Sequence, residues 1–290
     1  MRKIIGLLLF LLACDSEKPG ETMFNIVFSE HSGITFSNTI TENKTLNILD
    51  YEYLYNGGGV GIGDFNLDGL PDICFAGNMV TSRIYLNLGD LRFEDITVSS
   101  GIQTDDWCTG ISVVDINNDG KPDIHISTAH DLSLGNSDNY FFINETDTLG
   151  NVKFRNLAKE MNLDNLSYTM QAVWLDYDQD SDLDMFLANN SKEDYPKNNP
   201  FGQKKDGSGK STDRLFRNNG LGANGIPSFE DVSQEAGITI EGWSLGVTVT
   251  DINQNGRPDI YVANDFLSND ILYVNNGNGT FSNKIDSISS

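Results

Sequence analysis

The sequence predicts an all-β fold built from repeated four-stranded sheets, and three observations lead to this expectation. The 290 residues include 28 glycines and 10% aromatic residues, as in proteins with short strands and many turns. One acidic nine-residue pattern occurs four times, starting at Asp64, Asp115, Asp176 and Asp251. Alternating apolar residues stand before and after every copy, which indicates strands. Four short strands in each repeat of roughly 60 residues are typical of β-propeller blades.

Each expected unit contributes its strands in the same order. In the first unit, Val60–Ile62 precedes the acidic pattern, Ile73–Ala76 follows it, and Ile84–Asn87 comes third. A glycine-containing turn then leads into Phe93–Asp95, and Gly101-Ile102 closes the unit. The units span about 24–92, 93–153, 154–228 and 229–284, within a propeller region of residues 24–290. The third unit carries a Lys-rich loop insertion at 191–213.

Oxygen-bearing side chains recur at positions 1, 3, 5 and 9 of the four acidic patterns. Position 6 is glycine in three of the patterns, and glycine permits the sharp turn that directs these side chains inward. Carboxylate and amide oxygens in this number suit Ca²⁺, whereas Mg²⁺ retains its waters and needs a stricter octahedron. The sequence therefore predicts up to four structural Ca²⁺ ions. The predicted ligands are Asp64, Asn66, Asp68, Asp72, Asp115, Asn117, Asp119, Asp123, Asp176, Asp178, Asp180, Asp184, Asp251, Asn253, Asn255 and Asp259.

Two patterns depart from the common form. Ser181 replaces the turn glycine in the third pattern, and we expect it to strain that turn. Asn255 replaces an acid in the fourth, so the four patterns carry 3, 3, 4 and 2 acids at the ligand positions. We therefore expect the fourth pattern to bind its ion most weakly. If all four were only Asx-rich turns, these 12 carboxylates would be crowded without a counter-charge, which favours the metal interpretation.

An EF-hand is the nearest rival interpretation, and position 12 excludes it. An EF-hand loop needs a bidentate Glu at position 12. Position 12 here is Phe75, Ile126, Leu187 or Val262, and each lies in an expected strand. No helical pattern flanks any of the four loops, so they join strands.

The four loops with their flanking strands resemble FG-GAP and VCBS repeats over about residues 24–283. The literal Phe-Gly and Gly-Ala-Pro signature is absent, so the VCBS type is the closer of the two. The resemblance implies a Ca²⁺-binding β-propeller, as in integrin α-subunit heads, and implies metal ligands at the sixteen positions above. Proteins of this kind usually continue further, and the sequence ends within what resembles a closing strand. We therefore expect the N-terminal part of a larger propeller, which would associate with the remainder or with itself.

The N-terminus resembles a bacterial lipoprotein signal. Met1-Arg2-Lys3 precedes nine apolar residues at 4–12, which match a secretory segment and are too few to span a bilayer. Ala13-Cys14 resembles the end of a lipobox, so residues 1–13 are expected to be a signal peptide, Cys14 the lipidated residue and 14–23 a tether. The alternative is an ordinary signal peptide, with Cys14 incidental. The lipid would be the chain's only membrane contact, at the bacterial outer membrane, cell surface or periplasmic face.

Charge excludes one class of partner and leaves two classes of function. The formal charge of −23 argues against nucleic acid, because a phosphate backbone requires Lys and Arg to replace its counterions. The first hypothesis is a non-enzymatic binding or scaffold module for a protein or glycan. The alternative is a propeller enzyme acting on polysaccharide, a lyase or a Ca²⁺-dependent hydrolase, with the loop at 191–213 as the only basic cluster. No nucleophile elbow or His-Glu-x-x-His pattern occurs, and His125 stands where other units have packing residues.

Cysteines and recurring aromatic residues leave smaller alternatives open. Cys74 and Cys108 lie in apolar, strand-like stretches, and buried free thiols are favoured over a disulfide. Neither belongs to a Cys-x-x-Cys pair, which argues against zinc. Trp107, Tyr168 and Trp243 each stand eight residues before an acidic pattern. We expect them to pack between blades, and the alternative is stacking on a sugar.

Overall fold

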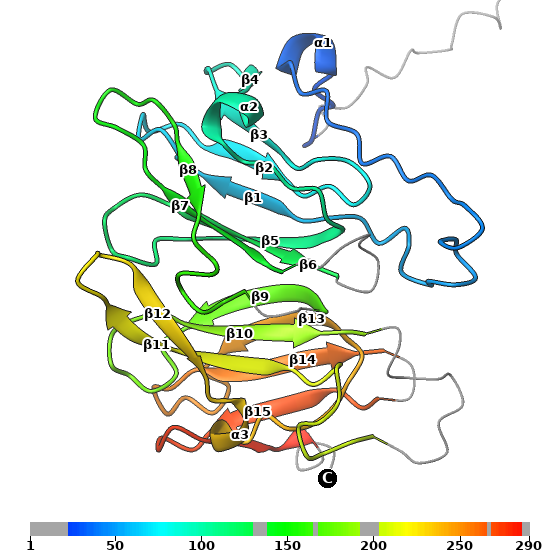
Figure 1. Ribbon diagram of the computed structural model, residues 1–290, viewed down its shortest axis with the longest axis vertical. Coiled ribbons are helices and arrows are strands. Elements are labelled where there is room, and N and C mark those ends of the chain that lie inside the picture. The colour runs from blue at the N-terminus through cyan, green and yellow to red at the C-terminus, as the bar shows by residue number, and fades with distance from the viewer. Residues whose placement is uncertain (1–22, 130–137, 165–167, 192–202, 266–267, 286–290) are drawn as a thin grey trace, which may run out of the picture.

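Four antiparallel four-stranded sheets make up the chain, as predicted. The computed structural model describes residues 23–129, 138–164, 168–191, 203–265 and 268–285. The sheets follow one another in chain order, the first two in the upper half of Figure 1 and the last two in the lower half. Sheet 1 contains β1 (Val60–Gly63), β2 (Asp72–Phe75), β3 (Arg83–Asn87) and β4 (Phe93–Asp95), and sheet 2 contains β5 (Cys108–Val114), β6 (Asp123–Thr128), β7 (Tyr140–Asn144) and β8 (Phe154–Asn156). Sheet 3 contains β9 (Thr169–Leu175), β10 (Asp184–Asn189), β11 (Arg214–Leu221) and β12 (Pro227–Asp231), and sheet 4 contains β13 (Ser244–Thr250), β14 (Asp259–Asn264), β15 (Ile271–Asn275) and β16 (Phe281–Asn283).

The sheet boundaries differ from the unit boundaries that the sequence indicates. The expected units begin with Phe93, Phe154 and Phe229, but these residues lie in the fourth strand of the preceding sheet. β4, for example, pairs with β3 through Tyr85 opposite Asp95 and Asn87 opposite Phe93. The reason is local, because a short turn joins the two strands and an antiparallel hairpin is the pairing that such a turn allows.

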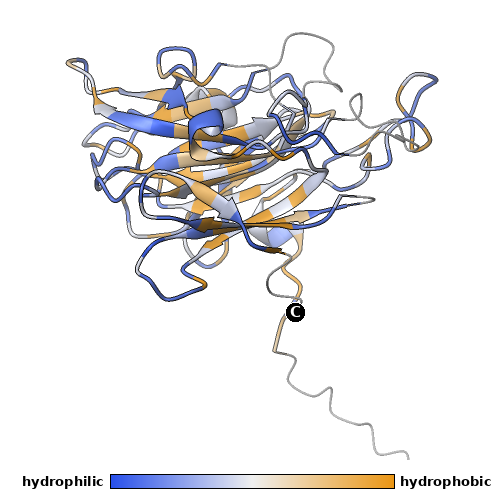
Figure 2. Cartoon of the chain, turned by 90° about the horizontal axis from the view of Figure 1, so that it is seen from below, coloured by the Kyte–Doolittle hydropathy of each residue, from blue (hydrophilic) through white to orange (hydrophobic). Residues whose placement is uncertain are grey.

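Neighbouring sheets pack face to face through apolar cores. β1 lies against β5, β5 against β9, and β9 against β13, so the first strands of the sheets form a continuous series. One buried cluster joins sheets 1 and 2, a second joins sheets 2 and 3, and a third joins sheets 3 and 4. Figure 2 shows apolar colour on the strands and hydrophilic colour on many of the connecting loops. This arrangement of blades in series is propeller-like.

Short turns close the units where the sequence predicts them. Three one-turn helices, α1 (Ser29–Ser32), α2 (Thr97–Ser100) and α3 (Ser233–Ala236), end at a glycine in the left-handed conformation. The glycines are Gly33, Gly101 and Gly237, with φ of 74°, 88° and 79°. Asn162, which closes the second unit, has φ of 60°. Glycine and asparagine accept this conformation at little cost, which explains their presence at these positions.

The segment before β1 packs onto the two distant tryptophans. Tyr51, Tyr53 and Leu54 are buried in one cluster with Trp107 of the β4–β5 connection and Trp243 before β13. The Tyr53 hydroxyl donates a hydrogen bond to Asp265 Oδ2 at 3.0 Å. The two tryptophans are 4% and 5% exposed, so neither offers a face to a sugar. Both tryptophans pack against residues 51–54, with the Trp107 ring against Tyr51 and the Trp243 ring against Tyr53.

Several sequence expectations concern residues with little structural description. The signal peptide (1–13), Cys14 and all but the last residue of the tether (14–23) lie outside the described residues, as do residues 192–202 of the Lys-rich loop.

Cys74 and Cys108 are free and buried, which confirms their expected state. Burial raises the pKa of both thiols, to about 11 for Cys108. None of the described helices is long and apolar enough to cross a membrane.

Candidate metal centre

The four acidic loops adopt one common backbone conformation. We name them loop 1 (64–72), loop 2 (115–123), loop 3 (176–184) and loop 4 (251–259). Position 4 has a positive φ in all four: 62° at Leu67, 53° at Asn118, 66° at Gln179 and 59° at Gln254. Position 6 is also left-handed, at Gly69 (86°), Gly120 (83°), Ser181 (79°) and Gly256 (83°). Ser181 therefore adopts the strained conformation that we expected, at a cost on the order of 1 kcal/mol.

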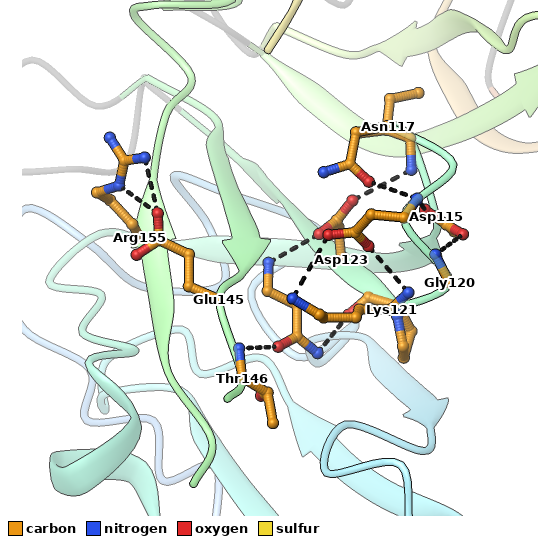
Figure 3. A network of polar contacts seen from close by, with 12 residues as sticks. Asp115, Asn117, Gly120, Lys121, Asp123, Glu145, Thr146 and Arg155 are labelled. Atoms are coloured by element: carbon orange, nitrogen blue, oxygen red, sulfur yellow. Dashed lines mark hydrogen bonds and ion pairs between the residues drawn. The ribbon is translucent and has the colours of Figure 1, made fainter. Parts of the chain in front are cut away.

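The acid at position 1 organises the turn of each loop. Its two oxygens accept hydrogen bonds from the backbone N–H groups of positions 5 and 6. In loop 2, the Asp119 N–H donates to Asp115 Oδ1 at 3.1 Å, and the Gly120 N–H donates to Asp115 Oδ2 at 2.9 Å. Figure 3 shows this loop with Asp115, Asn117 and Asp123 close together. The same pair of bonds forms at Asp64, Asp176 and Asp251.

The acid at position 9 is buried and joins the loop to its sheet. Asp72, Asp123, Asp184 and Asp259 are at most 1% exposed. In each loop, one oxygen accepts the N–H of position 2, at 2.8 to 3.1 Å. The other accepts the N–H of an asparagine in the third strand, at 2.7 to 2.9 Å. These asparagines are Asn87, Asn144, Asn218 and Asn275. Backbone hydrogen bonds from the loop and from the third strand thus fix the position-9 carboxylate.

Loop 3 brings three carboxylates into one cluster. Asp176, Asp178 and Asp184 each place one oxygen within 4.8 Å of the other two. This spacing suits oxygens that share one Ca²⁺ at roughly 2.3–2.6 Å. In addition, Asp182 Oδ1 is buried and has no hydrogen-bond partner among the described residues. An all-oxygen set with an unsatisfied carboxylate oxygen beside it fits a hard divalent cation, and these residues would hold it.

The electrostatics of the loops also favour a cation. Burial is the main cause that raises the pKa of the position-9 acids, to about 6 for Asp72, about 7 for Asp123 and about 8 for Asp184. Neighbouring acids of the same loop raise these pKa values further. Burial and the adjacent acids likewise raise the pKa of Asp182 to about 6. A bound cation would supply the missing counter-charge and hold these groups ionised.

Position 5 of loop 3 also takes part in the turn of the loop. The cluster contains positions 1, 3 and 9, whereas Asp180 Oδ1 accepts the backbone N–H of Asp182 at 3.2 Å. The same local bond, from the position-7 N–H, forms at Asp68, Asp119 and Asn255. The sequence analysis did not single out Asp182. Its signal is a fifth acid, at position 7, where loops 1, 2 and 4 have Leu70, Lys121 and Arg257.

Two residues that could have served catalysis, His125 and Lys210, lie against aromatic rings. His125 is fully buried, its ring 5.9 Å from the rings of Phe141 and Trp174, and burial lowers its pKa to about 3. This confirms a packing role. Lys210 of the Lys-rich loop lies over the ring of Tyr168, with its Nζ 5.4 Å from the centroid. His130 lies outside the described residues.

The fold and the loops define a repeat protein with propeller-like blades and acidic, oxygen-lined loops. In agreement, the FG-GAP-like repeat family model matches residues 64–126 and 251–290. The matched regions include loops 1, 2 and 4. Loop 3 lies outside them, although it has the same backbone conformation.

Curated relatives align with a larger part of the chain than the family model does. Cartilage acidic protein 1 of Homo sapiens is 26% identical over 234 residues, which are 79% of this chain and 31% of that protein. The protein of the same name in Xenopus tropicalis is 26% identical over 213 residues, 72% of this chain and 29% of that protein. The chain thus spans about a third of the length of these relatives.

A solved structure aligns with the chain at a low score. This structure is of an Agrocybe aegerita lectin and concerns its specific recognition of non-reducing terminal N-acetylglucosamine. It covers 77% of this chain and 64% of its own chain at 16% identity, with a TM-score of 0.31.

Proposed function

We propose that the chain is a Ca²⁺-stabilised binding or scaffold module that recognises a protein or a glycan and has no catalytic activity of its own. The observation that carries the proposal is the carboxylate cluster of Asp176, Asp178 and Asp184. It lies in a loop whose backbone is repeated three more times in the chain. The FG-GAP-like repeats support the same reading, since repeats of this kind generally form binding modules.

The proposed role of Ca²⁺ is structural. A site with a Kd on the order of 0.1 mM would add roughly 1.8 kcal/mol to the free energy of unfolding in about 2 mM Ca²⁺. Four such sites would add roughly 7 kcal/mol, which is comparable with the whole stability of an ordinary domain. Ions at the four loops would therefore decide whether this chain of charge −23 remains folded.

Chelation tests the proposal directly. We expect excess EGTA to lower the melting temperature strongly, and added Ca²⁺ to restore it. The variant Asp178→Ala removes one carboxylate of the cluster and should lower the Ca²⁺ stoichiometry in calorimetric titration. The control is Asp90→Ala, because the Asp90 side chain is 88% exposed and lies outside the four loops. A melting curve that EGTA leaves unchanged contradicts the proposal.

The proposed location is the bacterial envelope, with a lipid on Cys14 as anchor. The support is the sequence of residues 1–14 and the net charge of −23, which disfavours docking onto anionic lipid. Cys14→Ser should move the chain from the detergent phase to the aqueous phase in a phase-partition experiment. A variant that stays in the detergent phase would exclude this anchor.

A further inference from the structure

The strand that precedes each acidic loop contributes two side chains to the contact with the preceding sheet. These side chains stand four and two residues before the loop, and we call them the docking positions. In sheet 2 they are Ile111 and Val113, which pack against the core shared by sheets 1 and 2. In sheet 3 they are Ala172 and Trp174, and in sheet 4 they are Val247 and Val249, each pair packed against the core shared with the sheet before it.

The preceding sheet receives these side chains at two other positions, three residues and one residue before its own loop. We call them the receiving positions. In sheet 1 they are Gly61 and Gly63, and the fit is close. A Cβ at Gly61 would lie 2.6 Å from Ile111 Cγ2, and one at Gly63 would lie 3.1 Å from Val113 Cγ1. The interface between consecutive sheets is therefore a repeated feature of the molecule, formed three times.

Sheet 1 has docking positions that none of the described sheets covers. Val60 and Ile62 occupy them and are 57% and 62% exposed. They share a face of sheet 1 with Phe75, since Val60 pairs with Phe75 and Ile62 with Ile73 across β1 and β2. Phe36 stacks on Phe75 with the ring centroids 5.1 Å apart, so the N-terminal segment covers part of this face. The part at Val60 and Ile62 stays open.

Sheet 4 presents the other side of this type of contact, because its receiving positions are uncovered. Its receiving positions are Thr248 and Thr250, and both are exposed. One end of the series of sheets thus presents uncovered apolar docking positions, and the other end presents uncovered small receiving positions. Together they are the two halves of the contact that already joins sheets 1 to 2, 2 to 3 and 3 to 4.

We propose that the face of sheet 1 around Val60 and Ile62 binds the face of sheet 4 around Thr248 and Thr250 in a second copy of this chain. Continuity with the three interfaces inside the chain carries the proposal. The contact is heterologous, because the two surfaces differ. Two such contacts related by a two-fold axis would close a ring of two copies with eight sheets, which is within the usual range of four to eight blades.

The oligomeric state tests this proposal without reference to metal binding. We expect the purified chain to have the mass of a dimer by light scattering in both Ca²⁺ and EGTA, as long as it remains folded. Ile62→Asp and Thr248→Lys should each give a folded monomer, because a charge on either face would be buried without a fitting partner. The control is Val98→Asp, since Val98 is 92% exposed and lies on α2, and it should remain a dimer.

Mixing the two monomeric variants distinguishes this contact from others. Each variant retains one intact face, so a mixture of I62D and T248K should form heterodimers through the two intact faces and the opposite charges. A wild-type monomer at every concentration would overturn the proposal, and the open face would then be left to a sheet from another protein. A dimer that I62D does not dissociate, or a mixture that stays monomeric, would overturn it as well.

Discussion

At the scale of single residues, one position that recurs in the four sheets holds a fully buried acid in sheet 3. The residue just before the third strand accepts a hydrogen bond from the N–H group near the end of the second strand. Ser82 does so in sheet 1 and Asn139 in sheet 2, whereas sheets 3 and 4 have Asp213 and Asp270. Asp213 is fully buried, and its Oδ2 has no hydrogen-bond partner among the described residues. Burial raises its pKa to about 7.

Asp213→Asn should therefore stabilise the protein at neutral and alkaline pH. The asparagine keeps an acceptor for the Asn189 N–H, which lies 2.9 Å from Asp213 Oδ1, and removes the cost of burying a charge. Asn139 shows that an asparagine fits the equivalent position, where its Nδ2 donates to Thr169 Oγ1 at 3.2 Å. We expect an increase in the free energy of unfolding on the order of a few kcal/mol at pH 8, measured by urea denaturation in saturating Ca²⁺.

The sign of the pH dependence follows from the raised pKa. An acid whose pKa is higher in the folded than in the unfolded protein stabilises the fold fully below the unfolded value, near 4. That stabilisation is lost as the pH rises through the folded value of about 7. The difference between D213N and the natural chain should therefore grow from pH 4 to pH 8. A difference that is constant over this range would exclude an ionisable Asp213 as the cause.

At the scale of elements, asparagines that end the third strands connect neighbouring loops. Asn275 Nδ2 donates to the Tyr177 carbonyl at 2.8 Å, inside loop 3, although Asn275 belongs to sheet 4. Asn144 Nδ2 makes the equivalent bond to the Phe65 carbonyl of loop 1 at 3.1 Å. Tyr177 lies between Asp176 and Asp178 of the carboxylate cluster. The conformation of loop 3 thus depends on a residue 98 positions further along the chain.

Asn275→Ala should weaken Ca²⁺ binding at loop 3. The substitution leaves the Tyr177 carbonyl without its buried donor, and an unsatisfied buried group costs about 1–3 kcal/mol, which corresponds to about a tenfold or greater change in affinity. Terbium luminescence sensitised by Tyr177 and Trp174 would report on this loop. Asn87→Ala is the matched control, because these hydrogen bonds of Asn87 stay within its own sheet and loop 1: its N–H donates to Asp72, its Nδ2 donates to the Pro71 carbonyl, and its Oδ1 accepts the Gly89 N–H. Equal terbium affinity in N275A and the natural chain would rule out this coupling.

Most of the fold and part of the site can be predicted because they are encoded locally and repeated. Four copies of one spacing of acids, glycine and apolar residues predict four strands per sheet and the turn of each loop. The spacing predicts position 5 as a ligand, and it does not show that one oxygen of Asp180 also accepts the N–H two residues later. The packing of Tyr53 onto Trp243 was not predictable, since these residues are distant in sequence and their contact occurs once.

At the scale of the whole molecule, residues 51–54 connect sheets that are not neighbours in the series. Leu54 is fully buried in the cluster that contains Trp107, before sheet 2, and Trp243, before sheet 4. The Tyr53 ring meets the Trp243 ring edge to face, with the centroids 6.3 Å apart. Proteins built from serial repeats unfold cooperatively only as far as their neighbouring interfaces couple them. A contact that skips a sheet adds coupling between the two halves of the series.

Leu54→Ala should therefore reduce both stability and cooperativity. Removing a fully buried leucine side chain costs about 2–5 kcal/mol, and here the cavity would lie where the segment joins sheets 2 and 4. We expect calorimetry to show a lower melting temperature and a calorimetric enthalpy that exceeds the van't Hoff enthalpy, because the two halves would then unfold separately. Leu49→Ala is the control, since Leu49 is 86% exposed in the same segment and should leave the transition unchanged. A lower but still two-state transition in L54A would show that the loss is local packing, and that the three serial interfaces couple the sheets by themselves.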